Sequence, residues 1–244
     1  MFIAAVLRGM ITLEFEARIE NVIVRTYNVQ SFRFARPREF NYRPGQFAFV
    51  TVKVAGQKMR KSLTLSSSPT ELDYIEFTKK LTGHPFSNGL EALKIGDTVR
   101  LDVPYGNFAL DERFPRVAML AGGMGITPMR SMCKYCTDRN LPAVVTLLYA
   151  NSTEADIVFR RELEEMEKQN RSLKVVFTLS ETRPDWKGRM GRINAHMIRE
   201  EVPDFLTAVF YVCGPPAMVD AMGIMLGELG ISKDSIKTED LTGY

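Results

Sequence analysis

The first 110 residues alternate apolar and polar positions in short runs, which is the pattern of strands that bury one face. Pro and Gly turn signals separate these runs. The runs lie at residues 12–29, 46–54, 62–67, 74–81 and 98–103. Several short strands at this spacing predict an antiparallel β-barrel.

After the segment "DERFP" at residues 111–115, apolar strands alternate with amphipathic helices. The predicted strands lie at residues 116–121, 143–150, 173–180 and 208–214. The predicted helices begin at Thr127 and lie at residues 159–169, 193–201 and 216–229. This alternation predicts a parallel sheet with helices on both faces. We therefore expect two domains, a barrel over residues 1–112 and an α/β domain over residues 113–244.

Composition narrows the class of protein. The 244 residues are 45% hydrophobic and 25% charged, and the net charge of +3 is spread along the chain, so it gives a nucleic-acid-binding function little support. Three cysteines, an odd number, argue against a disulfide-stapled fold and favour a reducing, cytoplasmic location. Arg8 interrupts the apolar start, and we expect neither a signal peptide nor stable membrane insertion.

The segment "LAGGMGITPMR" at residues 120–130 places three glycines between a strand and a helix. Pro128 suits a first helical turn. Unpaired N–H groups and the helix dipole would attract an anion there, and glycine would let a pyrophosphate approach the main chain. The alternative is a tight turn with no ligand, since the spacing is not G-x-G-x-x-G.

Five segments in order resemble signatures of the ferredoxin–NADP reductase family: "YRPGQF" (42–47), "KSLTLSSSP" (61–69), "GDTVRLDVPYGNF" (96–108), "AGGMGITP" (121–128) and "CGPPAM" (213–218). The resemblance spans essentially the whole chain. It implies an N-terminal barrel that binds FAD, a C-terminal domain that binds NADH or NADPH, and a flavin between the two. It assigns the nucleotide pyrophosphate to Gly122, Gly123, Gly125 and Thr127.

The resemblance places the flavin against residues 61–64, where the family has Arg-x-Tyr-Ser/Thr. Thr64 matches and would bond the flavin ring edge, with Ser62 beside it. Lys61 supplies a point charge in place of the arginine fork. Leu63 replaces the tyrosine, so it would give apolar contact without stacking. An alternative is that Arg60 substitutes for the arginine by a one-residue shift.

The segment "GHPFSNGL" at residues 83–90 resembles the family's contact with the flavin pyrophosphate. By this resemblance the Ser87 hydroxyl and the N–H groups of Ser87 and Asn88 would face the anion. Ser87 could instead be a helix cap. The preceding strand would lie beside the flavin, which makes Thr78 and Lys79 candidate contacts.

The family's nicotinamide pocket maps to Cys213, Gly214 and Pro215 and, near the end of the chain, to Glu239. With Thr64, the resemblance makes Cys213 and Glu239 the candidate catalytic residues. Cys213 could instead be a buried core cysteine. Tyr244 could stack on the flavin, or the tail could be frayed.

The choice between NADH and NADPH depends, by the resemblance, on Ser180 and Glu181, because NADP-specific relatives place Ser-Arg there to bind the 2′-phosphate. A carboxylate accepts bonds from a ribose diol and repels a phosphate, so Glu181 favours NADH. Arg183, Lys187 and Arg189 follow in a flexible-looking loop and could reach the phosphate.

The remaining cysteines, Cys133 and Cys136, lie within one helix and have no second pair, so we interpret them as packing residues and predict no metal site. The sequence thus predicts an FAD-dependent NAD(P)H oxidoreductase with a separate one-electron acceptor, such as a ferredoxin-like or iron–sulfur protein. The alternatives are an electron-transfer subunit of a larger complex without independent turnover, and a flavin-free nucleotide-binding module.

Overall fold

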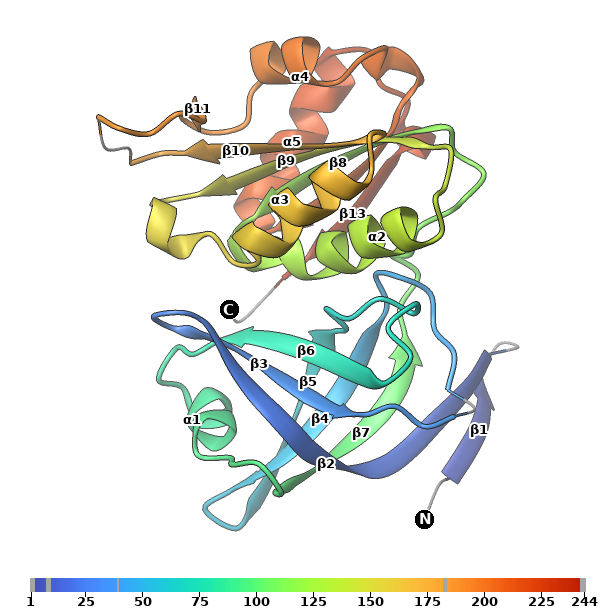
Figure 1. The fold of residues 1–244 in the computed structure, drawn as a ribbon, viewed down its shortest axis with the longest axis vertical. Coiled ribbons are helices and arrows are strands. Elements are labelled where there is room, and N and C mark those ends of the chain that lie inside the picture. The colour runs from blue at the N-terminus through green and yellow to red at the C-terminus, as the bar shows by residue number, and fades with distance from the viewer. Residues whose placement is uncertain (1–2, 8–9, 39, 182–183, 242–244) are drawn as a thin grey trace. The chain divides into compact units, whose positions relative to one another are not determined.

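A computed structural model describes residues 3–7, 10–38, 40–181 and 184–241. The chain divides into two compact units, of which unit 1 runs to Leu110 and unit 2 begins at Asp111. Each unit is treated by itself below (Figure 1).

Unit 1 is an antiparallel half-barrel, with the strand order β5-β4-β7-β2-β3-β6 and β1 paired to β2. Its elements are β1 (Ile3–Leu7), β2 (Met10–Thr26), β3 (Val29–Ala35), β4 (Phe47–Val54), β5 (Gln57–Thr64), β6 (Tyr74–Lys80), α1 (Pro85–Glu91) and β7 (Thr98–Tyr105). The short helix α1 packs on β4.

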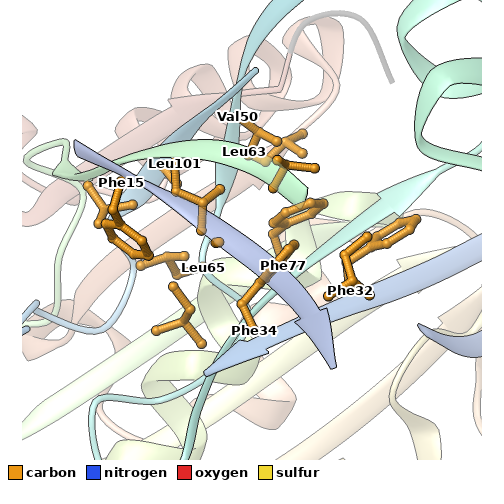
Figure 2. Packing of buried hydrophobic residues seen from close by; sticks show 14 of the residues in the cluster. Phe15, Phe32, Phe34, Val50, Leu63, Leu65, Phe77 and Leu101 are labelled. Atoms are coloured by element: carbon orange, nitrogen blue, oxygen red, sulfur yellow. The ribbon is translucent and has the colours of Figure 1, made fainter. Parts of the chain in front are cut away.

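The barrel core is built from the inward residues of the alternating strands, as Figure 2 shows. Phe77 of β6 stacks on Phe32 and Phe34 of β3, with 5.3 Å between ring centroids in each pair. Each fully buried side chain of this size contributes roughly 1.5–3 kcal/mol of stability relative to an exposed one. Leu63 of β5 also belongs to this core.

The two edges of this sheet are β5 and β6. Within the described part of unit 1, one bridge between Leu65 and Phe77 joins them outside the regular ladders. We call this boundary the β5–β6 seam. It leaves the outer main-chain edges of both strands without the continuous ladder that the other strand pairs have.

Unit 2 contains a parallel sheet with the strand order β11-β10-β9-β8-β12-β13. Its strands are β8 (Arg116–Gly122), β9 (Val144–Asn151), β10 (Leu173–Leu179), β11 (Arg189–Met190), β12 (Val209–Gly214) and β13 (Ile236–Asp240). The chain moves from β8 through β9 and β10 to β11, then returns to place β12 on the other side of β8. The reversal between β8 and β12 is the point where ligands of such sheets bind, outside the carboxyl ends of the strands.

Helices cover both faces of this sheet. Those of unit 2 are the α-helices α2 (Ile126–Asp138), α3 (Arg160–Gln169), α4 (Ala195–Glu201) and α5 (Pro216–Glu228), and the 3₁₀ turns η1 (Gly123–Gly125), η2 (Glu154–Asp156), η3 (Phe205–Thr207) and η4 (Lys233–Ser235). Helices α2 and α3 lie together on one face (Figure 1). Helices α4 and α5 share a core on the other, through residues such as Met197 and Val219.

The predicted fold class, a barrel followed by a parallel-sheet α/β domain, is confirmed. The pattern did not predict the two-residue strand β11, which is too short to show a period. Among the described residues, no helix has the length and apolar character needed to span a bilayer.

Candidate functional site

The glycine turn lies at the carboxyl end of β8, where η1 leads into α2. Gly123 has a positive φ of 50°, a region that side chains with a Cβ disfavour. A Cβ at Gly123 would meet no heavy atom of the described chain within 4 Å. This glycine therefore leaves open space over the main chain, which is the geometry that a bound anion needs.

The two neighbouring glycines, Gly122 and Gly125, are explained by packing against other parts of the chain. A Cβ at Gly122 would overlap the Met218 side chain of α5. A Cβ at Gly125 would stand 2.8 Å from the Gly214 nitrogen and closer still to the Cys213 carbonyl oxygen. Gly125 is required because the turn packs directly on the main chain at the end of β12, whereas a Cβ at Gly122 would displace the flexible Met218 side chain. Of the three predicted pyrophosphate glycines, Gly123 is the one whose open side suits a ligand.

Thr127, which the resemblance assigns to the pyrophosphate, has its hydroxyl engaged within the chain. Thr127 is buried, and its Oγ1 donates to the Met124 carbonyl oxygen at 3.0 Å. A hydroxyl has one proton, so this bond leaves none for a phosphate oxygen. Binding of an anion at this turn falls to its main-chain N–H groups.

Cys213 is the next-to-last residue of β12 and is fully buried. Burial raises the pKa of its thiol well above the usual value, and the nearby carboxylates of Glu239 and Asp240 raise it further. A thiol in this state is neutral, so it can line a pocket but cannot act as a nucleophile. Gly214 is buried beside it, and the exposed Pro215 leads into α5.

Glu239 lies on β13 directly opposite Cys213 in the strand register. Its Oε2 atom is buried and has no hydrogen-bond partner among the described residues. Burial raises the pKa of the Glu239 carboxyl from 4.5 to about 7. A buried carboxyl oxygen of this kind has unused capacity for a ligand N–H.

Sequence reasoning missed Asn151, the last residue of β9. It is 9% exposed, and neither its Oδ1 nor its Nδ2 makes a hydrogen bond in the described structure. The amide lies close enough to the Tyr149 hydroxyl to oppose the rise that burial causes in the pKa of Tyr149, although the two groups do not meet hydrogen-bond geometry. Its position at the carboxyl end of a strand was the available signal.

Ser180 and Glu181 follow β10 directly and are exposed. Their N–H groups bond to the carbonyl oxygens of Asn151 and Ser152, at 3.1 and 2.9 Å. The turn that carries the Glu181 carboxylate is therefore fixed to the end of β9, at the same edge of the sheet as the glycine turn.

Of the cations that could bind a 2′-phosphate, Arg189 is already paired with carboxylates. Arg189 donates through Nε to Glu201 at 2.5 Å and through Nη2 to Glu200 at 2.8 Å, so two carboxylates of α4 hold its guanidinium. Arg183 lies outside the described residues, as does Tyr244, so the structure does not address either assignment.

In unit 1, Thr64 ends β5 and is buried opposite Phe47, whereas Lys61 and Ser62 are exposed. Leu63 requires a correction, because it is 2% exposed and packs in the barrel core (Figure 2). Its side chain is occupied by protein contacts. The alternation of the strand, which turns Leu63 inward with its partner Ala48, is the reason.

Arg60 is an unsuitable substitute for the family's arginine. Its Nη2 donates to Asp102 at 2.6 Å, and its guanidinium lies 4.2 Å from the centroid of the Phe49 ring. Both contacts hold it on the outer face of β4 and β7. Lys61 is thus the nearer cation that remains for a phosphate.

Lys79 on β6 is 4% exposed. Burial, together with the positive charges of Lys61 and Lys80, lowers the pKa of its amine to about 8. Three ammonium groups near one another repel, and an anion among them would relieve that repulsion. This charge arrangement fits a diphosphate.

The remaining candidate flavin contacts, Ser87, Asn88 and Thr78, already make hydrogen bonds inside unit 1. The Ser87 hydroxyl is paired with the Thr82 hydroxyl at 3.1 Å. The Asn88 N–H donates to the His84 carbonyl oxygen at 2.9 Å, so it is used inside α1 and cannot also face an anion. Thr78 is buried, with its hydroxyl within 2.8 Å of those of Ser31 and Ser66. Its contact with a ligand would have to come from the main chain.

Cys133 and Cys136 are buried in α2, and the Cys133 thiol contacts the Met119 sulfur at 3.8 Å. Burial raises the pKa of both thiols, that of Cys136 to about 12. Neutral buried thiols of this kind are packing groups.

The residues present fit both nucleotides. Unit 1 offers an interrupted sheet edge beside a cluster of lysines, which suits an anionic dinucleotide with a planar ring. At the carboxyl edge of its sheet, unit 2 offers an open glycine turn and the side chains of Asn151 and Glu239, which carry buried polar atoms without partners among the described residues. A bound nicotinamide nucleotide would form the hydrogen bonds that the side chains in unit 2 leave unused.

Comparisons with known proteins agree with this division. Residues 16–110 match the family described as "Oxidoreductase FAD-binding domain", and residues 119–223 match "Oxidoreductase NAD-binding domain". The chain is 34% identical over 225 residues to NADH-cytochrome b5 reductase 1 of Aspergillus terreus, covering 85% of this chain and 75% of that protein.

It is also 32% identical over 216 residues to the glycine betaine monooxygenase reductase subunit of Pseudomonas aeruginosa, covering 86% of this chain. The matched region spans 59% of that subunit's length. Among solved structures, the cytochrome b5 reductase domain of Ulva prolifera nitrate reductase aligns with a TM-score of 0.82 at 27% identity, covering 93% of this chain and 97% of that one.

Proposed function

Because this chain belongs to the ferredoxin–NADP reductase-like family of NAD(P)H-dependent flavin oxidoreductases, we propose that it oxidises NADH through FAD and passes the electrons to a separate one-electron acceptor protein. The observation that carries the proposal is the match of each family domain to the unit whose residues suit its nucleotide. Unit 1 carries the lysine cluster at the seam, and unit 2 carries the open glycine turn.

When bound, FAD would accept both electrons of a hydride and release them one at a time. The protein supplies the binding groups. Lys61 and Lys79 would neutralise the flavin diphosphate, and Thr64 would hydrogen-bond the flavin ring edge. The placement of Lys79 beside like charges supports this division of roles.

The residues of unit 2 would bind and orient the nicotinamide nucleotide. The main chain at Gly123 would take the pyrophosphate, as its open side allows. Cys213 would line the nicotinamide pocket as a neutral thiol, which cannot compete as a nucleophile. Glu239 and Asn151 would accept or donate hydrogen bonds to the nucleotide, because both have buried polar atoms without partners.

The preference for NADH rests on Glu181, which is exposed at the end of β10. Its carboxylate can accept bonds from a ribose diol and repels a 2′-phosphate. Arg189 would not attract the 2′-phosphate, since Glu200 and Glu201 hold its guanidinium.

The acceptor is proposed to be a ferredoxin-like or other iron–sulfur protein. One observation favours the alternative of an electron-transfer subunit within a larger complex. The chain corresponds to part of a longer reductase subunit of a monooxygenase, and shares no more than 59% of that subunit's length.

The test begins with the absorption spectrum of the purified chain, which we expect to show oxidised flavin bands that NADH bleaches. Steady-state oxidation of NADH with ferricyanide as acceptor should then give turnover. A chain that carries no flavin after incubation with FAD would contradict the proposal. Flavin that NADH reduces, without turnover on any soluble acceptor, would favour the subunit alternative.

A further inference from the structure

Four buried side chains of unit 1 and the partly buried Arg25 close a ring of hydrogen bonds: Arg25, Ser31, Thr78, Ser66 and Glu76. Arg25 Nε donates to Ser31 Oγ at 2.7 Å, and Ser31 Oγ lies 2.7 Å from Thr78 Oγ1. Thr78 Oγ1 lies 2.8 Å from Ser66 Oγ, which donates to Glu76 Oε1 at 3.0 Å. Arg25 Nη2 returns to Glu76 Oε2 at 2.9 Å and so closes the ring.

The two charged groups fix the ends of the ring. The Glu76 carboxylate can only accept, and it receives bonds from Arg25 and from the Ser66 hydroxyl, while Ser31 accepts from Arg25. In the pairs Ser31–Thr78 and Thr78–Ser66, either hydroxyl can be the donor. Linked bonds of this kind polarise and strengthen one another.

The ring also holds a charge in the interior. The Glu76 side chain is fully buried, and a second arginine, Arg33, donates to its Oε2 at 2.7 Å. The guanidinium of Arg33 in turn lies 3.9 Å from the centroid of the Tyr74 ring. Removing ions of this kind from water is costly, so a buried ion cluster is weak evidence for stability alone. Its best-attested benefit is to fix one arrangement of the elements that it joins.

The elements joined here are the two sides of the β5–β6 seam. Arg25 comes from β2 and Ser31 from β3, whereas Glu76 and Thr78 come from β6. Ser66 stands on the other side of the seam, two residues after Thr64 at the end of β5. The main chain adds two bonds at the same place, from the N–H groups of Ser66 and Ser67 to the Glu76 carbonyl oxygen, at 2.8 and 3.3 Å.

We infer that this ring is the positioning device of the flavin site, in which Glu76, Ser66 and Thr78 hold the end of β5 and the end of β6 at a fixed separation across the seam. Thr64 lies two residues from Ser66, and Lys79 is adjacent to Thr78. The ring residues act through these neighbours. The inference rests on the proposed function, because it assumes that FAD binds at this seam.

The test removes single hydroxyl groups from the ring, with a side chain of the same shape at Thr78 and a loss of the oxygen alone at Ser66. Thr78→Val deletes the bonds to Ser31 and Ser66, and Ser66→Ala deletes the bonds to Thr78 and Glu76. The matched control is Thr70→Val, whose hydroxyl makes a 2.7 Å bond to Ser68 outside the ring. Each holoprotein is compared for FAD dissociation constant, visible spectrum, kcat, NADH KM and urea midpoint.

We expect both ring variants to raise the FAD dissociation constant about tenfold and to shift the flavin bands, since each variant loses two bonds of the ring. NADH KM should stay within about twofold, because that nucleotide binds to unit 2. Thr70→Val should match the unaltered protein in all measurements except a small change in urea midpoint. Addition of saturating FAD should restore kcat in both ring variants.

Ring variants that lose urea stability while binding FAD with unaltered affinity and spectrum would overturn the inference and leave the proposed function standing. Ring variants that behave like Thr70→Val throughout would do the same. If the unaltered chain binds no FAD, the proposed function fails and this inference fails with it.

Discussion

The glycine turn permits a prediction in which two nearby glycines affect different properties. Gly123→Ala should leave the fold intact and weaken binding of the nicotinamide nucleotide. Gly125→Ala should destabilise unit 2, because its Cβ would press on the main chain of Cys213 and Gly214. The control is Gly227→Ala in α5, where a Cβ would meet no heavy atom within 4 Å.

The magnitudes follow from the surroundings of each position. Gly123 has a φ of 50°, and a residue with a Cβ in the left-handed region costs about 1–2 kcal/mol. A Cβ at Gly125 would lie 2.8 Å from the Gly214 nitrogen, and neither main chain can move alone, so overpacking should cost about 3 kcal/mol. Gly227→Ala should stabilise the helix by about 0.5–1 kcal/mol.

Nucleotide affinity separates the first variant from the other two. A methyl group over the main chain of Gly123 would occupy the space of a phosphate oxygen and break at least one bond to it. A hydrogen bond to a charged group is worth about 1.5–3 kcal/mol, so NADH KM should rise roughly ten- to a hundredfold. The unaltered protein and Gly227→Ala should share the same KM.

Two measurements check these values. NADH KM comes from ferricyanide assays with saturating FAD. Stability comes from urea unfolding followed by the fluorescence of Trp186, the one tryptophan of the sequence, which lies in unit 2 and so reports on that unit. A Gly123→Ala variant with unaltered KM would refute the assignment of the pyrophosphate to this turn. A Gly125→Ala variant as stable as Gly123→Ala would refute the packing argument.

Three other side chains give independent tests. The raised pKa of Glu239 means that its stabilising contribution is fully present below pH 4.5 and is lost as the pH rises through about 7; urea midpoints should therefore show Glu239→Gln gaining on the unaltered protein between pH 5 and 8.5, by at most ~3 kcal/mol, and parallel pH profiles would contradict this. Glu181→Arg should shift the ratio of kcat/KM for NADPH over NADH upward at least tenfold, and an unchanged ratio would show that the position does not contact the ribose. Asn151→Leu should raise NADH KM several-fold while keeping or improving stability, because it removes two buried polar atoms without partners; an unchanged KM would exclude the residue from the site.

Periodicity predicted a strand-rich half followed by alternating strands and helices, because strand and helix periods are local properties of the chain. The class of ligand came instead from the resemblance of five segments to the family's signatures. The sequence could not predict which polar atoms already make hydrogen bonds inside the protein. Thr127 and Asn88 have suitable groups by type, yet one bonds to Met124 and the other to His84. Those bonds depend on the local turn of the main chain.

Side-chain direction was the second source of error. Leu63 was expected to face a ligand by alignment with the family's tyrosine, whereas its register with Ala48 turns it into the core. The ring around Glu76 was missed for a related reason. Its members come from β2, β3, β6 and the segment after β5, and pairing between distant strands has no signature in any one segment.

The late position of β12 in the chain has a consequence for synthesis. Strand β8 pairs with β9 on one side and with β12 on the other, although β12 is made only after three further strands of the same sheet. A ribosome releasing the chain in order can complete the strands of unit 1 early, whereas β8 keeps an open apolar edge until Val209–Gly214 emerges. A chain truncated before β12 would present that unpaired edge of β8 to other copies of the chain.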